Sequence, residues 1–129
     1  MINKKLIFTL PVVMMAISIF VMSSIHQVPF VSDAIMGQDK LLHMTAYFIF
    51  GILMQFAVVA QKPNLTLKKT YFAVAIIAIL YALGDELHQH FVPGRMCDFW
   101  DFAADSIGIL LSLLLLPKIK NFVMSKLSS

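Results

Sequence analysis

The 129-residue sequence has few charged residues and almost no cysteine. Asp, Glu, Lys and Arg make up 13% of the chain, against about 25% in ordinary globular proteins. The single cysteine, Cys97, excludes an internal disulfide and a cysteine-based zinc site. The sequence also lacks Gly-x-Ser-x-Gly, phosphate-binding glycine loops and His-Glu-x-x-His. No familiar catalytic motif therefore identifies a reaction.

Apolar residues are correspondingly abundant: they make up 60% of the chain, and the mean hydropathy is +0.85. A water-soluble protein of this length could not bury so much apolar surface, which excludes a soluble enzyme, a secreted disulfide scaffold and a disordered tail. The formal charge of +3 does not indicate a nucleic-acid partner, because the positive residues lie between apolar runs and not in a basic stripe. We therefore expect an integral membrane protein.

Four apolar stretches are each about as long as a membrane-spanning helix, which needs about 20 residues. They cover about residues 6–25, 40–60, 70–91 and 99–116, and short connections join them. The first stretch could be a signal peptide, but it is as long as a full span and lacks a clean cleavage site. The pattern predicts one all-α polytopic domain over residues 1–129, folded as a four-helix transmembrane bundle.

The charges are distributed unequally between the two sides of this bundle. Eight of the ten Lys and Arg residues fall on one side, whereas Lys40, Arg95, all seven acids and all four histidines fall on the other. The positive-inside rule assigns the lysine-rich side to the cytoplasm. We therefore expect a multi-pass protein of the cytoplasmic (inner) membrane with both termini inside the cell.

Ionisable residues within spanning segments are costly, and they are functional candidates by default. Asp85 and Glu86 lie just before the outer end of the third stretch, and Asp105 and His43 lie at a similar depth in the fourth and second stretches. Two acids near the C-terminal end of a helix are disfavoured by its dipole and need a positive partner. Arg95, in the turn that follows, is the obvious candidate; a bound cation or a shared proton is another.

Helical spacing places further polar residues on faces that can turn toward one another. Residues three or four apart lie on the same face of a helix, and polar residues with this spacing recur on the last three stretches. The residues concerned are Asp39 and His43, Asp85 and Gln89, and Asp98, Asp101 and Asp105. The simplest arrangement is a bundle whose polar stripes meet inside and open to the outer surface.

Some polar residues also have a purely structural explanation. Asp39 and Asp98 stand at expected helix starts, where an N-cap aspartate satisfies free N–H groups; Asp39 could equally pair with Lys40 or His43. We expect Trp100 to be an interfacial anchor. His26 and Asp33 are expected in a solvated loop.

The histidines do not predict a metal site. His88 and His90 are two residues apart, so on a helix their side chains point about 200° away from each other and cannot readily chelate one ion. We therefore expect no histidine-based metal site and no cofactor.

The polar residues form a pattern that resembles the VanZ-like family of small bacterial membrane proteins. The pattern runs through Asp39-Lys40-x-x-His43-x-x-x-Tyr47-x-x-x-Gly51, then Asp85-Glu86-x-x-Gln89-x-Phe91-x-Pro93-Gly94-Arg95, then Asp98-x-x-Asp101-x-x-x-Asp105-x-x-Gly108. Asp105 departs from it, since many relatives have asparagine there. The resemblance implies a multi-span protein of the cell envelope in a family whose founding member is linked to low-level resistance to the glycopeptide teicoplanin.

The leading hypothesis is an acidic, arginine-containing pocket, open to the extracytoplasmic side, that binds and in an enzymatic version modifies an anionic lipid or wall-precursor group. Arg95 would hold the anion, and Glu86 with Asp85 would be the candidate acid and base. The other residues expected at the site are Asp39, His43, Gln89, Asp98, Asp101 and Asp105. The alternatives are a non-catalytic interaction subunit of an envelope complex and a small proton- or ion-coupled carrier, which would require oligomers. Whether the protein is an enzyme stays open.

Overall fold

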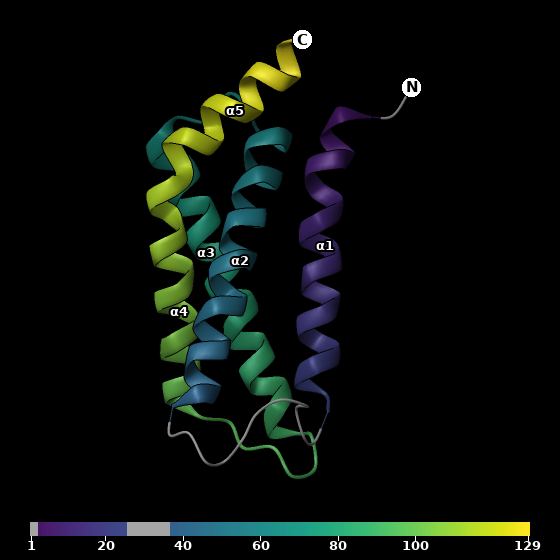
Figure 1. The fold of residues 1–129 in the computed structure, drawn as a ribbon, viewed down its shortest axis with the longest axis vertical. Helices are drawn as coiled ribbons and strands as arrows, with labels where there is room; N and C mark the ends of the chain where they lie inside the picture. Colours follow the sequence, from purple (N-terminus) through teal and green to yellow (C-terminus); the bar gives the residue numbers. More distant parts are fainter. Residues whose placement is uncertain (1–2, 26–36) are drawn as a thin grey trace.

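The computed structural model describes residues 3–25 and 37–129, so the expectation for His26 and Asp33 lies outside the described residues. Within these residues the secondary structure is helical throughout (Figure 1). The helices are α1 (Lys4–Ser23), α2 (Gln38–Gln61), α3 (Leu67–His90) and α4 (Phe99–Ser112), followed by the 3-10 turn η1 (Leu113–Leu115) and α5 (Leu116–Ser128).

Four helices are long and apolar enough to cross a membrane: α1, α2, α3 and the continuous segment Phe99–Ser128. This confirms the predicted all-α fold with four candidate spans. The last helix continues well beyond the predicted end at residue 116, because the more polar segment that follows Leu116 stays helical as α5. Pro117 does not stop it, because it lies in the first turn of α5, where a helix needs no N–H donor.

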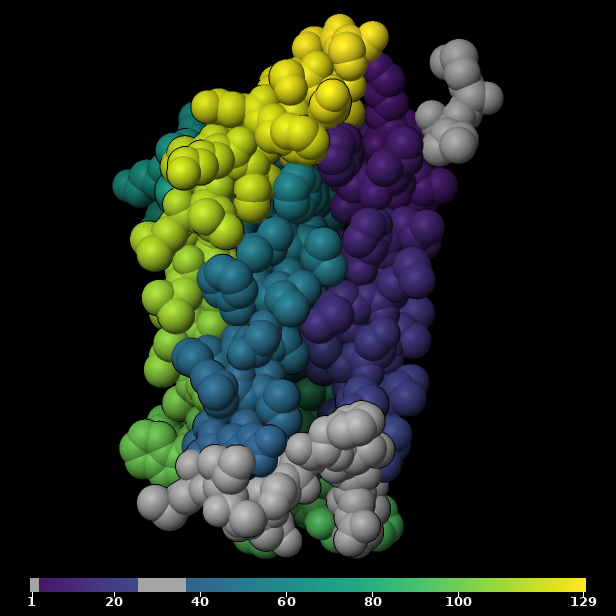
Figure 2. Space-filling view, in the orientation of Figure 1, coloured from purple at the N-terminus to yellow at the C-terminus, as the bar shows by residue number. Residues whose placement is uncertain are grey.

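The helix α2 lies at the centre of the bundle, with α1 on one side and α4 on the other (Figures 1 and 2). Helices α2 and α4 approach most closely where Gly108 faces the backbone of Met44 and Phe48. A second glycine, Gly51, faces Ser112 two turns away. Small residues at such a crossing let two helix backbones come together, as in other membrane helix pairs.

The bundle core is apolar, and so is much of the outer surface. Tyr47 and Phe50 of α2 pack against Ala78 and Ala82 of α3 and against Ile19 of α1. Large apolar side chains are also exposed on the outside of each helix. This surface suits a lipid environment, in which the backbone polar groups must be satisfied within helices.

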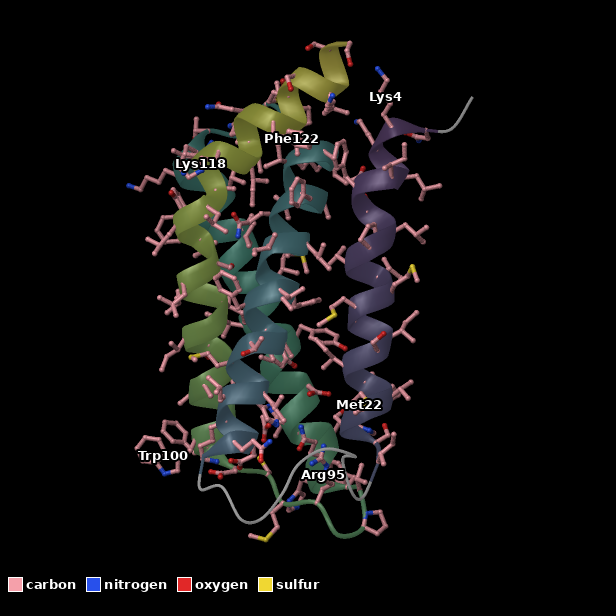
Figure 3. All side chains as sticks on the ribbon, in the orientation of Figure 1. Lys4, Met22, Arg95, Trp100, Lys118 and Phe122 are labelled. Carbon is pink, nitrogen blue, oxygen red and sulfur yellow. The ribbon has the colours of Figure 1, made fainter. Side chains whose placement is uncertain are left out.

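The two ends of the bundle differ in chemistry. Lys4 and Lys118 lie at the end that carries the C terminus, whereas Arg95 and Trp100 lie at the opposite end (Figure 3). The side of the membrane that each end faces stays a prediction from the positive-inside rule.

Candidate functional site

A lysine at the start of α2 holds together three acids of the polar end. The Nζ atom of Lys40 lies 2.6 Å from Asp101 Oδ1, 2.9 Å from Asp98 Oδ2 and 3.3 Å from Asp39 Oδ2. The Asp101 side chain is mostly buried, with 13% exposed, while Lys40 is 36% exposed. We call these four residues the lysine cluster. It fastens the start of α4 to the start of α2.

Asp98 is both a helix N-cap and a member of the polar end's ion-pair cluster. It is the N-cap of α4, where its Oδ1 accepts a hydrogen bond from the Trp100 N–H at 2.8 Å, and its Oδ2 accepts from Lys40. The Lys40 ammonium and then the Trp100 N–H lower the pKa of Asp98. Asp39 is not an N-cap: the cap of α2 is Gly37, whose φ of 86° is a conformation that glycine adopts freely.

Asp85 of α3 joins three helices through hydroxyl and amide donors. It accepts hydrogen bonds from Ser23 Oγ of α1 at 2.6 Å, from the Tyr47 hydroxyl of α2 at 3.2 Å and from Gln89 Nε2 at 3.5 Å. All four side chains are buried. The sequence pattern predicts neither of the hydroxyl contacts. A serine near a helix end commonly bonds its own backbone, and Ser23 does this as well, donating to the carbonyl of Phe20.

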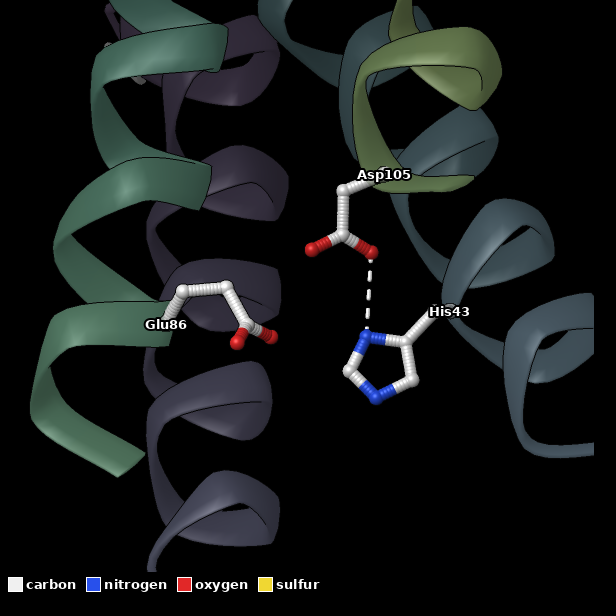
Figure 4. A group of neighbouring side chains, drawn as sticks. All are labelled: His43, Glu86 and Asp105. Carbon is white, nitrogen blue, oxygen red and sulfur yellow. Dashed lines mark hydrogen bonds and ion pairs between the residues drawn. The ribbon is translucent and has the colours of Figure 1, made fainter. Parts of the chain in front are cut away.

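Three further ionisable side chains converge between α2, α3 and α4 (Figure 4). His43 Nδ1 lies 3.0 Å from Asp105 Oδ1. Glu86 accepts hydrogen bonds from Gln89 Nε2 at 3.3 Å and from the Asp98 backbone N–H at 3.2 Å. One ligating atom from each of His43, Glu86 and Asp105 lies within 4.8 Å of the other two. We call these three residues the triad.

The two histidines near the end of α3 do not join the triad. His88 Nε2 lies 2.9 Å from Ser24 Oγ, and its ring stacks on Phe20 with centroids 4.5 Å apart. His90 is exposed. His88 therefore connects the end of α1 to α3. The group that could hold a metal ion combines side chains from three different helices. Spacing along a single helix gives no signal for such a group.

The comparisons with known proteins show the family. A family model described as VanZ/LLP1 matches residues 4–121, which is nearly the whole chain. The chain belongs to this family. Comparison with curated proteins and with solved structures gives no match. The residues that carry the VanZ pattern lie inside the matched region, and the polar end of the bundle is built from them.

Arg95 does not contact the acids that the sequence suggests as its partners. Its guanidinium donates to the backbone carbonyls of Met22 and Ser23, at 3.4 Å each, and forms no ion pair with Asp85 or Glu86 in the described chain. The prediction that Arg95 compensates these acids is therefore wrong. The carbonyls at the C-terminal end of α1 carry partial negative charge and attract it instead.

An apolar groove lies between α1 and α3 of this VanZ-family bundle, with α2 as its floor. Its polar end is marked by Tyr81, whose hydroxyl donates to the Ala16 carbonyl at 2.6 Å. Asp85 follows Tyr81 by about one helical turn. The groove is lined by Val12, Val13, Ala16, Phe50, Met54, Ile77, Leu80 and Tyr81. On α3 the lining therefore ends about one turn short of Asp85.

Proposed function

We propose that this VanZ-family protein binds a lipid-linked, anionic component of the bacterial envelope at the outer face of the cytoplasmic membrane. The hydrocarbon chain lies in the groove between α1 and α3, and the anionic group reaches Arg95. The observation that carries the proposal is an apolar groove whose lining on α3 ends at Tyr81, toward the polar end of the bundle where Arg95 lies.

The position and lining of the groove favour a hydrocarbon chain as its occupant. It is formed within helices long and apolar enough to span a membrane, so lipid chains surround its opening. Its walls are apolar apart from the Tyr81 hydroxyl, which already donates to Ala16. A chain lying there gains contacts with α1, α2 and α3 together.

The polar end of the groove favours an anionic head group. Arg95 is half-buried, and its two hydrogen bonds to carbonyls are long. A guanidinium is a planar fork that binds phosphate or carboxylate in a bidentate manner. Asp85 is buried against Ser23 at the end of α1, and Glu86 is buried next to it in the chain, on the side of α2 and α4; both are candidates for an acid and base in a catalytic version.

Neighbouring isoleucines on α3 provide a matched test of the groove. Ile77 lines it and is 47% exposed, whereas Ile76 is 56% exposed and lies outside it. We expect Ile77→Trp to fill the groove and lower retention of polyprenyl phosphate or phosphatidylglycerol by about tenfold, while Ile76→Trp retains both. Native mass spectrometry of the detergent-purified protein, incubated with each lipid, measures the bound fraction.

Arg95→Gln completes this test. It is expected to remove the preference for these anionic lipids over phosphatidylcholine while leaving the groove intact. Equal lipid retention in wild type, Ile77→Trp and Arg95→Gln would contradict the proposal and favour an interaction subunit. Loss of lipid turnover in Glu86→Gln, with binding retained, would establish the enzymatic version.

The proposed orientation can be tested with the single cysteine. Cys97 is exposed at the polar end, and desolvation followed by the negative charge of Glu86 raises the pKa of its thiol. We expect a membrane-impermeant maleimide to label Cys97 in intact spheroplasts at about pH 8.5, where more of the reactive thiolate is present. The control carries Cys97→Ser with Ser129→Cys, and it should be labelled only after permeabilisation. The reverse pattern would overturn the orientation.

A further inference from the structure

We infer that His43, Glu86 and Asp105 form a binding site for a divalent transition-metal ion, which neither the family match nor the proposed lipid binding requires. The triad offers one imidazole and two carboxylates, from α2, α3 and α4 respectively. Zinc and manganese ions accept this mixture of nitrogen and oxygen ligands, whereas magnesium and calcium favour oxygen ligands alone.

The first observation is an unsatisfied carboxylate oxygen. The Asp105 side chain is 0% exposed, and its Oδ1 pairs with His43. Its Oδ2 has no hydrogen-bond partner among the described residues. In Figure 4 the carboxylate of Asp105 turns this second oxygen toward the side where Glu86 lies. Burying an unpaired carboxylate oxygen is costly, so a positive group in this position stabilises the arrangement.

The second observation is that the two fixed cations of this end lie elsewhere. Lys40 pairs with the three acids of the lysine cluster, and Arg95 donates hydrogen bonds to carbonyls of α1. Neither forms an ion pair with Glu86 or Asp105 within residues 3–25 and 37–129. Two buried acids therefore face each other with only His43 as a charge partner.

The geometry is close to that of a coordination sphere. Bonds of about 2.1 Å place neighbouring ligand atoms roughly 3.0–3.4 Å apart. His43 Nδ1 and Asp105 Oδ1 are already 3.0 Å apart, and a metal ion bound by both atoms would take the place of the proton between them, which leaves to solvent. The three ligating atoms lie within 4.8 Å of one another, so a side-chain adjustment of roughly 1 Å brings Glu86 onto the same ion.

The surrounding residues orient these ligands as an outer shell does in metal sites. Glu86 is fixed by Gln89 and by the Asp98 backbone N–H. His43 Nε2 lies 3.9 Å from Asp101 Oδ2, and Asp101 is held by Lys40. At this distance Asp101 forms an ion pair and not a hydrogen bond with His43; an approach of about 1 Å would let it accept the Nε2–H hydrogen bond that orients a ligating histidine.

Metal binding to the detergent-purified full chain tests the site. After chelator treatment and dialysis, we expect the wild type to bind about one Zn²⁺ or Mn²⁺ ion per chain in the presence of excess Mg²⁺. Glu86→Gln and Asp105→Asn should each weaken binding on the order of 100-fold, measured by calorimetry. His90→Gln removes an exposed imidazole of the same end from outside the triad, and it should bind like the wild type.

A readout on the wild type keeps the test valid if a triad variant fails to fold. Addition of Zn²⁺ should shift the nitrogen NMR signals of His43 and leave those of His88 and His90 unchanged. Absence of metal binding by the wild type would overturn the site. Equal weakening by His90→Gln and Asp105→Asn, or shifts at His88 and His90 in place of His43, would also overturn it. Since lipid retention is measured separately, either proposal can fail while the other stands.

Discussion

Replacing Gly108 by alanine is expected to lower the free energy of unfolding by about 2 kcal/mol. A Cβ atom at this position would collide with the carbonyl oxygen of Met44 and crowd the backbone nitrogen of Phe48. Both atoms belong to the backbone of α2, so no side-chain rotation relieves the overlap and the helices must move apart. The higher helix propensity of alanine, about 1 kcal/mol, offsets only part of this cost.

Gly84 provides the matched control. It also lies within a helix, but a Cβ atom there meets nothing within 4 Å. Gly84→Ala should therefore be neutral or slightly stabilising, while Gly108→Ala lowers the midpoint of thermal unfolding in detergent, followed by circular dichroism. If both variants unfold like the wild type, α2 and α4 do not meet at Gly108. Because Asp105 lies one turn from Gly108, the same change is expected to separate Asp105 from His43.

The sequence predicts the fold well because the length and hydropathy of a spanning helix depend on local composition. The first three predicted spans end within three residues of α1, α2 and α3. The predicted end of the fourth span, residue 116, coincides with the start of α5, where the apolar run ends and the chain takes a new direction after η1 but stays helical (Figure 1). A proline in the first turn of α5 is compatible with either continuation or a new helix.

The site is only partly predictable from the sequence. Helical spacing places its acids on particular helix faces, but it does not specify which residues of other helices contact them. The spacing of Asp39, His43, Asp101 and Asp105 predicts a shared polar layer, and α2 and α4 bring these residues together. The position of Arg95 depends on where α1 ends, which no spacing on α3 or α4 specifies. This is why its predicted partners are wrong.

The buried amide of Gln55 could have been recognised from the sequence as an interhelical contact, but the polar pattern does not include it. Gln55 stands alone in the apolar middle of α2 and is fully buried. Its Nε2 donates to Ser112 O at 2.9 Å and to Gly51 O at 3.1 Å. An isolated amide in a spanning helix predicts an interhelical hydrogen bond. Gln55 therefore supports the packing of α2 on α4 and not the polar site.

Removing the charge of Lys40 from the lysine cluster is also expected to cause a large loss of stability. Lys40→Met removes the ammonium that pairs with Asp39, Asp98 and Asp101, and leaves their charges next to one another. We expect a loss of about 2 kcal/mol, between the values for exposed and buried ion pairs, because the cluster is partly exposed. Thermal unfolding in detergent at low salt measures it, and the loss should shrink at high salt, where the charges are screened.

A double-mutant cycle separates charge from packing. Asp101→Asn removes the acid nearest to Lys40, at 2.6 Å, so adding it to Lys40→Met should recover part of the lost stability through a coupling of about 1 kcal/mol. Lys118→Met, at the opposite end of the bundle, should change stability by less than about 0.5 kcal/mol. If Lys40→Met and Asp101→Asn act additively, the ammonium of Lys40 and the carboxylate of Asp101 are not coupled. The polar end would then be held together by the hydrogen bonds of Asp85 and Glu86 and not by the lysine cluster.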